Sequence, residues 1–487
     1  MAKAIMIQGT MSNVGKSYVT AGLLRVFMQD GLKAAPFKSQ NMALNSFVTN
    51  EGLEMGRAQV MQAEAAGIEP SADMNPILLK PTTDVGSQVI VNGKAIGNMR
   101  AVDYFKHKQS LIPQIMSAYN RLSEKYDVIV IEGAGSPAEI NLKKNDIVNM
   151  GMAQMAKSPV LLVGDIDRGG VFAQLTGTYM LLEENEKKYI KGFVMNKFRG
   201  DKMILEPGIK MLEDICPVPV TGVLPYTPLD IDDEDSLSDR LGKKQTDEKN
   251  IFICVIKLPR ISNFTDFNML DSVEGCEVRY VDNGKELWDA DCIIIPGTKN
   301  TIADMQWLKE RKLDRMIRLM NNEGCPVVGI CGGFQMLGKK ITDDMGVEGE
   351  IKNINGLGLI DAETVMQSEK TCINGSKTLD GISGLFSVLN GSMANGYEIH
   401  AGVTKVGDRE IICGGKNNVF GTYLHGLFDK KEFLNKFLNV LSAETGKKIS
   451  ADFSYETVKE REYDKLADMV RENMDMQAVY RILGKGM

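Results

Sequence analysis

Residues 4–17 read Ala-Ile-Met-Ile-Gln-Gly-Thr-Met-Ser-Asn-Val-Gly-Lys-Ser, and they decide the fold of the first half of the chain. The apolar start predicts a buried strand, and residues 18–29 predict a helix after the glycine-rich loop. Such a loop presents backbone N–H groups and the positive end of the helix dipole to phosphates. It has five residues between its glycines, where the common motif has four, yet strand, loop and helix follow in order. We therefore expect a P-loop that binds ATP.

The residues of this loop have expected roles at the nucleotide. Lys16 is expected to reach the β- and γ-phosphates, and the Ser17 hydroxyl to bind Mg²⁺. Asn196 ends a later apolar run, where its amide can read the purine base; a local turn is the alternative. The residues expected to contact the nucleotide are Gly9, Thr10, Asn13, Val14, Gly15, Lys16, Ser17 and Asn196.

Acidic side chains stand at the ends of two other apolar runs. Glu132 ends one of them, and Asp165 and Asp167 end another. In a parallel α/β sheet, ligands bind at the carboxyl ends of the strands, where a carboxylate can hold the Mg²⁺ that bridges nucleotide phosphates. We expect Ser17 and Glu132 to bind the metal, and Asp165 and Asp167 to lie on the phosphate or substrate side. For each acidic residue, a structural cap or turn is the alternative.

A second chemical motif, Val-Val-Gly-Ile-Cys-Gly-Gly-Phe-Gln, spans residues 327–335. Glycines two positions before and two after Cys331 permit the sharp turn of a nucleophile elbow between a strand and a helix. The helix dipole there lowers the pKa of a thiol, and backbone N–H groups just beyond the cysteine can form an oxyanion hole. Gly332 and Gly297 are the expected donors. An inert, buried cysteine is the alternative.

A cysteine nucleophile needs a base, and the chain has only three histidines. His425 and His400 each follow a predicted strand, and the residues alone do not choose between them. His107 stands between two lysines on a predicted exposed helix and is expected to be solvated. So few histidines exclude a His-rich metal site.

Short apolar runs alternate with helical patterns along most of the 487 residues, which predicts an α/β fold with buried parallel strands. We expect two domains, each a mainly parallel sheet flanked by helices. The expected boundaries give a first domain at 1–226, an acidic linker at 227–249, a second domain at 250–445 and a helical tail at 446–487.

Composition restricts the class of protein further. Lys plus Arg number 57 against 64 Asp plus Glu, a net charge of −7, which argues against a nucleic-acid binder. No apolar run approaches the ~18 residues of a membrane helix. The eight cysteines include no C-x-x-C pair, so a reducing cytoplasm is expected.

Longer motifs run through both halves of the chain. They include Pro-Phe-Lys-Ser-Gln-Asn-Met-Ala-Leu-Asn-Ser at 36–46, Gly-Arg-Ala-Gln at 56–59, Asn-Pro-Ile-Leu-Leu-Lys-Pro-Thr at 75–82, Glu-Gly-Ala-Gly-Ser-Pro-Ala-Glu-Ile-Asn-Leu at 132–142, Asp-Ile-Asp-Arg-Gly-Gly-Val-Phe at 165–172, Asn-Lys-Phe-Arg-Gly-Asp at 196–201, Tyr-Glu-Ile-His at 397–400 and Tyr-Leu-His-Gly at 423–426. Together they resemble the cobyric acid synthases of cobalamin biosynthesis, over essentially the whole chain. That family joins a dethiobiotin-synthetase-like P-loop domain to a class I glutamine amidotransferase domain.

The resemblance implies that His425 is the base paired with Cys331, and it leaves His400 without an assigned role. Ordinary class I amidotransferases carry a glutamate two residues after the catalytic histidine, where this chain has Leu427. The resemblance therefore implies a Cys–His dyad and leaves open what orients His425.

Further site residues follow from the same resemblance. Those expected at the oxyanion or glutamine site are Gly297, Gly332 and Gln335. Those expected on the substrate or phosphate side are Lys38, Gln40, Asn41, Asp165 and Asp167.

The resemblance also implies an activity. It is the amidation of the b, d, e and g carboxylates of adenosylcobyrinic acid a,c-diamide, through an acyl phosphate made with ATP and Mg²⁺ and ammonia taken from L-glutamine. The expected partner is a small corrinoid, without nucleic acid or membrane. One alternative is a cobyrinic acid a,c-diamide synthase, which Gln-Asn-Met at 40–42 followed by Asn-Ser at 45–46 disfavours. The other is a non-enzymatic P-loop switch protein with an inactive amidotransferase-like domain, against which Cys331 and His425 argue.

Overall fold

The computed structural model describes residues 1–83, 86–229, 231, 250–449 and 455–485. They form two compact units: the first comprises Met1–Ala43, Glu54–Asp235 and Val458–Met487, and the second Leu44–Leu53 and Ser236–Thr457. The predicted α/β class with two sheet domains is confirmed. The acidic linker expected at 227–249 falls almost entirely outside the described residues. The units also depart from the sequence-based boundaries, because Leu44–Leu53 joins the second unit and most of the helical tail joins the first.

The central sheet of the first unit is wholly parallel, in the order β12-β11-β10-β1-β9-β2. Its strands are mostly apolar and buried, as strands covered on both faces must be. They are β1 (Lys3–Gly9), β2 (Ala34–Phe37), β9 (Val128–Glu132), β10 (Val160–Asp165), β11 (Ile190–Phe198) and β12 (Val220–Pro225). Because β1 lies between β9 and β10, the loop after β1 opens at the same edge of the sheet as Glu132 and Asp165.

A smaller sheet of order β3-β6-β7-β8 belongs to the same unit. Its strands are β3 (Gln40–Met42), β6 (Ile77–Thr83), β7 (Gly86–Val91) and β8 (Lys94–Arg100), and β5 (Glu54–Gly56) stands apart from it. The main helices of the unit are α1 (Lys16–Gln29), α2 (Arg57–Ala65), α3 (Ala101–His107), α4 (Ile112–Lys125), α5 (Met150–Met155), α6 (Val171–Leu181), α7 (Glu184–Lys187) and α8 (Lys202–Ile215).

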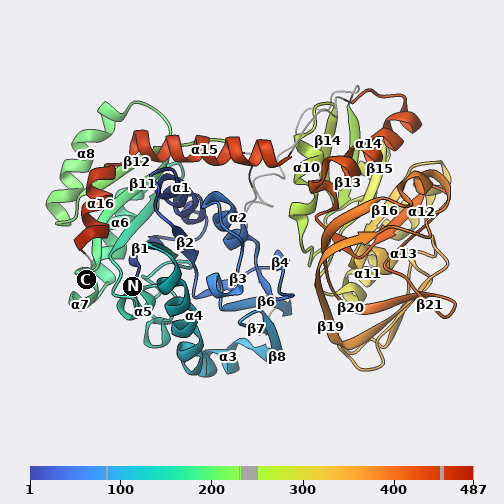
Figure 1. Cartoon of the computed structure of the whole chain (residues 1–487), viewed down its shortest axis with the longest axis horizontal. Helices are drawn as coiled ribbons and strands as arrows, with labels where there is room; N and C mark the ends of the chain where they lie inside the picture. Colours follow the sequence, from blue (N-terminus) through green and yellow to red (C-terminus); the bar gives the residue numbers. More distant parts are fainter. Residues whose placement is uncertain (84–85, 230, 232–249, 450–454, 486–487) are drawn as a thin grey trace. The chain divides into compact units, whose positions relative to one another are not determined.

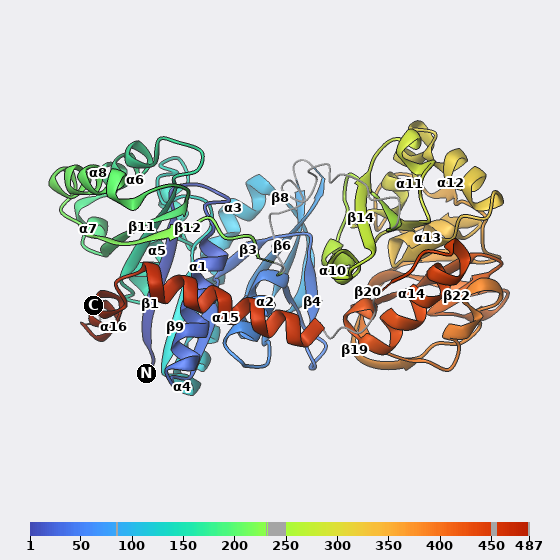
Figure 2. The ribbon, with the colours of Figure 1, turned by 90° about the horizontal axis from the view of Figure 1, so that it is seen from above.

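The helical tail packs onto α1 rather than standing alone. It consists of α15 (Tyr455–Asn473) and α16 (Met476–Lys485), and Figures 1 and 2 both draw α15 beside α1. Gly22 of α1 permits close approach, because a Cβ there would lie 2.6 Å from Cγ2 of Val470. Arg25 adds salt bridges of 2.6 Å to Glu460 and 2.9 Å to Asp464. The tail thus completes the core of the first unit.

The second unit has its own central sheet, ordered β14-β13-β15-β16-β23-β22 and parallel except for β22. Its strands are β13 (Ile251–Ile256), β14 (Cys276–Val281), β15 (Cys292–Ile295), β16 (Val327–Ile330), β22 (Cys413–Lys416) and β23 (Val419–Thr422). The main helices are α10 (Asn268–Ser272), α11 (Thr301–Glu310), α12 (Leu313–Asn322), α13 (Gly332–Leu337) and α14 (Lys431–Thr445).

A second sheet of this unit, β18-β17-β19-β20-β21, is built around one long antiparallel pair. Its strands are β17 (Lys340–Thr342), β18 (Asn353–Asn355), β19 (Glu363–Thr378), β20 (Met393–Val406) and β21 (Arg409–Glu410), with β24 (Leu424–His425) paired to β20. β4 (Ser46–Val48) also belongs to this unit.

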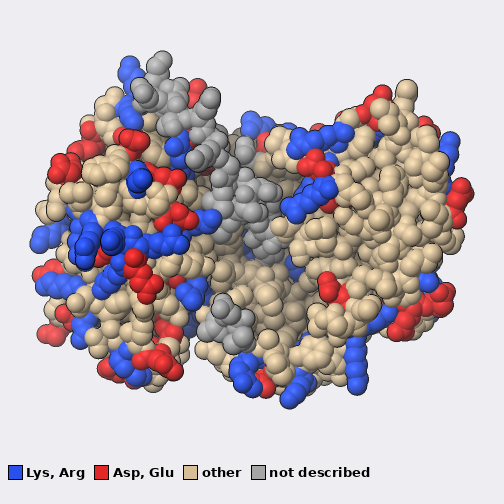
Figure 3. Space-filling view, turned by 180° about the vertical axis from the view of Figure 1, so that it is seen from behind, with Lys and Arg blue, Asp and Glu red and all other residues tan. Residues whose placement is uncertain are grey.

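On the face drawn in Figure 3, acidic side chains lie among the basic ones.

Candidate active sites

The loop after β1 has the backbone that the P-loop prediction requires. Gly15 has a φ of +89°, and a Cβ there would lie only 2.2 Å from Nδ2 of Asn196. At Gly9, a Cβ would lie 2.6 Å from Cγ2 of Val14. Asn13 also has a positive φ, of 60°. Glycine is therefore required at both ends of the loop, because any larger residue would collide with the loop or with Asn196.

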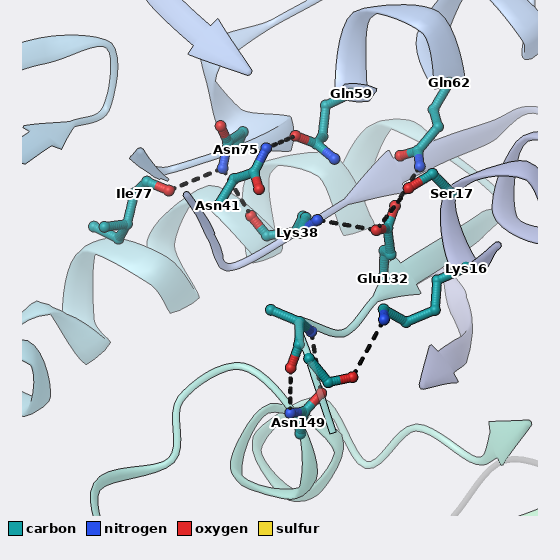
Figure 4. A network of polar contacts seen from close by, with 12 residues as sticks. Lys16, Ser17, Lys38, Asn41, Gln59, Gln62, Asn75, Ile77, Glu132 and Asn149 are labelled. Carbon is teal, nitrogen blue, oxygen red and sulfur yellow. Dashed lines mark hydrogen bonds and ion pairs between the residues drawn. The ribbon is translucent and has the colours of Figure 1, made fainter. Parts of the chain in front are cut away.

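Glu132 is the centre of a buried polar cluster next to this loop (Figure 4). One of its oxygens, Oε1, accepts hydrogen bonds from the Ser17 hydroxyl at 3.0 Å and from Lys38 Nζ at 2.9 Å. The other, Oε2, accepts one from Gln62 at 2.5 Å. Lys16 lies close by, donating to the carbonyls of Met11 and Gly135 at 2.9 and 3.2 Å. The end of β9, the start of α1, α2 and the segment after β2 thus bring two lysines, a hydroxyl, an amide and a carboxylate together.

Electrostatics keep Glu132 ionised in this cluster. Burial on its own would raise the pKa of the carboxyl group, which is only 2% exposed. The charge of Lys38, the hydrogen bonds from Lys38 and Gln62, and the charge of Lys16 outweigh burial and lower the pKa. An ionised carboxylate beside a serine hydroxyl is a donor set of the hard oxygen kind that Mg²⁺ takes.

Asn196 contacts the P-loop directly, and Asp165 acts on it through Lys197. The Asn196 amide donates to the carbonyl of Val14 at 2.8 Å and is almost buried. Asp165 forms a 3.1 Å salt bridge with Lys197, which in turn donates to the carbonyl of Asn13 at 2.6 Å. Both residues therefore help to hold the loop.

Three other predicted residues have partners away from Glu132. Asp167 pairs with Arg199 at 2.8 Å at the surface, and the hydroxyl of Thr10 donates to Gln174 at 3.1 Å. Gln40 accepts a 2.6 Å hydrogen bond from Tyr104.

The side chains of the motif at 36–46 have different partners. Asn41 donates to Gln59 at 3.1 Å, as Figure 4 also draws. Asn75 donates to the backbone carbonyl of Lys38 at 3.2 Å, so it fixes the main chain from which Lys38 reaches Glu132. Lys38 joins the Glu132 cluster through its side chain, whereas Gln40 bonds to Tyr104 and Asn41 to Gln59.

Cys331 occupies a strained turn between β16 and α13. Its φ of 51° and ψ of −108° are rare for a residue with a side chain. The flanking glycines permit the turn, because a Cβ at Gly329 would lie 2.6 Å from the carbonyl oxygen of Gly333, and one at Gly333 would lie 1.9 Å from that of Ile295. At Gly332 a Cβ would lie 2.7 Å from Thr298. The conformation is that of a nucleophile elbow.

His425, at the end of β24, faces this cysteine and is held by an aspartate. The Cys331 thiol interacts electrostatically with the His425 ring, whose Nδ1 lies 2.6 Å from Oδ2 of Asp266. The other oxygen of Asp266 accepts from the backbone N–H of Gly426 at 3.0 Å. All three side chains are buried. An ionised carboxylate only accepts, so Nδ1 carries its hydrogen toward Asp266 and Nε2 is left for the thiol.

The surroundings of His425 favour its protonated form. Burial alone lowers the pKa of His425, but the charge and hydrogen bond of Asp266 and the interaction with Cys331 raise it to about 10. Tyr397 stacks on the imidazole, with ring centroids 5.3 Å apart. On another side, a Cβ at Gly297 would lie 3.1 Å from Cε1 of His425, so Gly297 packs against the base.

The other histidines are engaged elsewhere. The ring nitrogens of His400 lie 2.8 Å from the carbonyl of Gly402 and 3.2 Å from Glu398, and the ring stacks on Tyr423 at 3.7 Å. With both nitrogens occupied, His400 is not placed as the base for Cys331. His107 is exposed, as expected.

Gln335 lies one helical turn beyond Cys331 and is 2% exposed. Its Oε1 accepts a 2.7 Å hydrogen bond from Thr301, and its Nε2 donates to Tyr423 at 3.2 Å. The side chain therefore lies in the wall of the site, bound to protein partners.

Sequence reasoning missed Asp266 and Gln62. Asp266 is 159 residues from His425 in the chain, in a short 3₁₀ turn, Phe264–Phe267, that carries no motif. Gln62 lies on α2, whose pattern reads as an ordinary buried helix. The only signal for Asp266 was negative: Leu427 stands where a glutamate is usual.

Two further features concern only the part of the chain that the structure describes. No group of three or more His, Cys, Asp or Glu side chains is arranged there to hold a metal ion. None of the helices in these residues combines the length and apolar character needed to cross a membrane.

Comparison with known proteins assigns a family to each half of the chain. Residues 5–238 match the family model of the CobQ/CobB/MinD/ParA nucleotide binding domain, and residues 252–433 match that of the CobB/CobQ-like glutamine amidotransferase domain. Curated relatives match over their full length. A cobyric acid synthase of Ruminiclostridium cellulolyticum is 53% identical over 100% of this chain and 98% of its own. One of Lachnoclostridium phytofermentans is 52% identical over 100% of both chains.

A cobyric acid synthase of Thermoanaerobacter sp. is 49% identical over 99% of both chains. At this identity and coverage, and with a P-loop cluster and a cysteine elbow both in place, the chain belongs to the cobyric acid synthase family.

Proposed function

We propose that the protein converts the b, d, e and g carboxylates of adenosylcobyrinic acid a,c-diamide to amides, using ATP and the side-chain amide of glutamine. The observation that carries this proposal is the buried arrangement of Cys331, His425 and Asp266 in a chain that also holds a P-loop cluster. A glutaminase and a nucleotide site in one polypeptide are the parts that glutamine-dependent amidation requires.

The glutaminase half begins with proton transfer from Cys331 to His425. Because the pKa of His425 is raised to about 10, its imidazole can hold the proton that it takes from the thiol at neutral pH. The thiolate attacks the glutamine side-chain carbonyl, and His425 returns the proton to the leaving ammonia. Water then releases glutamate from the thioester. Asp266 orients His425 throughout and stabilises its charge.

Backbone N–H groups at the elbow are suited to the oxyanion of this reaction. Gly332 directly follows Cys331, and Gly297 lies against His425. Donors fixed in the backbone need no rearrangement as charge develops, which is what makes them effective.

The synthetase half activates a substrate carboxylate as an acyl phosphate. Lys16 and the backbone of residues 9–17 hold the phosphates. Ser17 and Glu132 are the residues that would hold Mg²⁺, which supplies charge neutralisation on the phosphates when it is bound. Lys38, which pairs with Glu132, is the residue that we infer to meet the transferred phosphoryl group or the carboxylate.

The separation of the two chemistries gives the test. Cys331→Ala should abolish glutamine hydrolysis and glutamine-dependent amidation, yet retain amidation driven by high ammonium at raised pH, where more NH₃ is present. A Cys331→Ala protein that still uses glutamine would refute the glutaminase assignment. Loss of ammonium-driven amidation in the folded variant would refute the separation into two half-reactions.

A further inference from the structure

A segment of the N-terminal half of the chain belongs to the glutaminase unit. Leu44–Leu53, here named the strap, lies in the second unit although the residues on both sides of it lie in the first. It contains β4 and closes on itself, with Thr49 N–H donating to the carbonyl of Leu53 at 2.8 Å and Gly52 N–H donating to that of Thr49 at 2.9 Å. It begins a few residues after Lys38.

The strap is hydrogen-bonded to the turn that carries Asp266. The amide oxygen of Asn45 accepts from the backbone N–H of Phe264 at 3.2 Å. In return, the amide oxygen of Asn263 accepts from the backbone N–H of Ser46 at 3.1 Å. Asn263 has a φ of 54° and opens the turn, and its carbonyl accepts from the N–H of Asp266 at 3.1 Å. Two buried amides thus tie the strap to the residues just before Asp266.

The strap also holds the ring that stacks on the base. The Tyr397 hydroxyl donates to the carbonyl of Ser46 at 3.0 Å, and the Phe47 ring lies 5.1 Å from that of Tyr397. Val48 packs with Tyr397 and Ile399 in a small apolar cluster. The carbonyl of Ile399 in turn accepts from Cys331 Sγ at 3.7 Å. The strap therefore contacts elements on two sides of the Cys331–His425 pair.

We propose that the strap positions the glutaminase base, with Asn45 as a positioning residue that acts on His425 through the Asp266 turn. This proposal rests on the proposed function of Cys331 and His425. A buried amide left without its partner costs free energy, so matched bonds at Asn45 and Asn263 fix the turn in one place. Glutamine hydrolysis then depends on a segment that follows directly on the motif of the synthetase site.

The test uses the full chain and three substitutions. Asn45→Ala removes the acceptor for Phe264, and Asn263→Gly removes the acceptor for Ser46 while suiting the positive φ at that position. Asn390→Ala is the matched control, because Asn390 also binds backbone through its amide, at Ile382, in the same unit and away from the site. Glutamine hydrolysis is measured as kcat and KM across pH, and amidation is measured with ammonium as donor.

If the strap positions the base, Asn45→Ala and Asn263→Gly lower kcat for glutamine hydrolysis by about 10- to 100-fold, the cost typical of a small displacement of catalytic groups. KM changes little. The alkaline limb of the pH profile moves to lower pH, because a looser contact with Asp266 raises the pKa of His425 less. Amidation with ammonium and the control Asn390→Ala stay at the parental rate. Combined with Asp266→Asn, Asn45→Ala adds no further loss, because both act through one residue.

Parental kcat and pH profile in Asn45→Ala and Asn263→Gly would overturn the proposal, as would losses that multiply with those of Asp266→Asn. Equal loss of ammonium-driven amidation would assign the strap to the synthetase instead, and would also overturn it. If Asn45→Ala fails to fold, Asn263→Gly carries the test alone. Glutamine hydrolysis by Cys331→Ala would refute the proposed function itself. If Cys331→Ala does not hydrolyse glutamine but Asn45→Ala does so at the parental rate, only the role of the strap is refuted.

Discussion

Replacing Asp266 with asparagine removes the charge beside His425 and keeps the size of the side chain. In the parent, Oδ2 of Asp266 lies 2.6 Å from Nδ1 of His425, and the pKa of His425 is raised from an ordinary 6.5 to about 10. Near pH 7.5 such an imidazole is almost fully protonated, whereas at the ordinary pKa only about a tenth of the molecules are. Protonation alone therefore accounts for a loss of about tenfold.

Orientation adds to this loss. An asparagine can present its NH₂ group to Nδ1 and so favour the tautomer that cannot accept the thiol proton at Nε2. The equivalent change in a Ser–His–Asp enzyme costs about 10⁴ in kcat, so we expect Asp266→Asn to lower kcat for glutamine hydrolysis by about 10²- to 10⁴-fold. Glutamate release from glutamine is the assay, with ammonium-driven amidation as the measure of a folded, competent protein.

Glutamine hydrolysis within about threefold of the parent, in an Asp266→Asn protein with normal ammonium-driven amidation, would refute the reasoning. His425 would then be oriented by its packing against Tyr397 and not by the carboxylate.

Three other perturbations test separate parts of the account. Lys16→Ala should abolish amidation with either glutamine or ammonium while glutamine hydrolysis continues, and normal amidation by this variant with ammonium would contradict the P-loop assignment. Glu132→Gln removes the carboxylate charge that the buried Lys38 meets at 2.9 Å, so the free energy of unfolding in denaturant titrations should fall by about 3 kcal/mol. The dependence of amidation on Mg²⁺ concentration should also weaken, and an unchanged unfolding curve would count against the cluster. The folded pKa of His425, about 10, lies above its unfolded value of 6.5, so the stabilisation from its pair with Asp266 is complete below pH 6.5 and is lost as the pH rises toward about 10. The free energy of unfolding should therefore fall less steeply with pH in Asp266→Asn than in the parent, and equal slopes in the two proteins would contradict the raised pKa.

The chemistry encoded in short, continuous stretches could be predicted from the sequence. The P-loop and the elbow at Cys331 each need glycines at fixed spacing between a strand and a helix, and both are present where expected. Glu132 could be placed beside Ser17 because parallel strands end at one edge of a sheet, and their oxygens lie 3.0 Å apart.

Features that depend on long-range packing could not be predicted. Asp266 meets His425 only because a turn after β13 and the end of β24 fold together, and no local pattern marks that encounter. The same holds for the strap, whose apolar residues Phe47 and Val48 gave no sign of which unit would bury them. In the tail, helical spacing predicted helices but not that α15 would cover α1, which rests on Gly22 and the charges around Arg25.

The central claim is that Cys331 makes the ammonia and the P-loop site uses it. Mass spectrometry of the corrinoid product tests this most directly, after incubation with the a,c-diamide, MgATP and glutamine whose side-chain amide carries heavy nitrogen. The account predicts one step for each of the b, d, e and g carboxylates, each with the mass change of OH replaced by labelled NH₂, and no product from Cys331→Ala under the same conditions. Unlabelled amides in the product of the parent, or labelled amides made by Cys331→Ala, would contradict it.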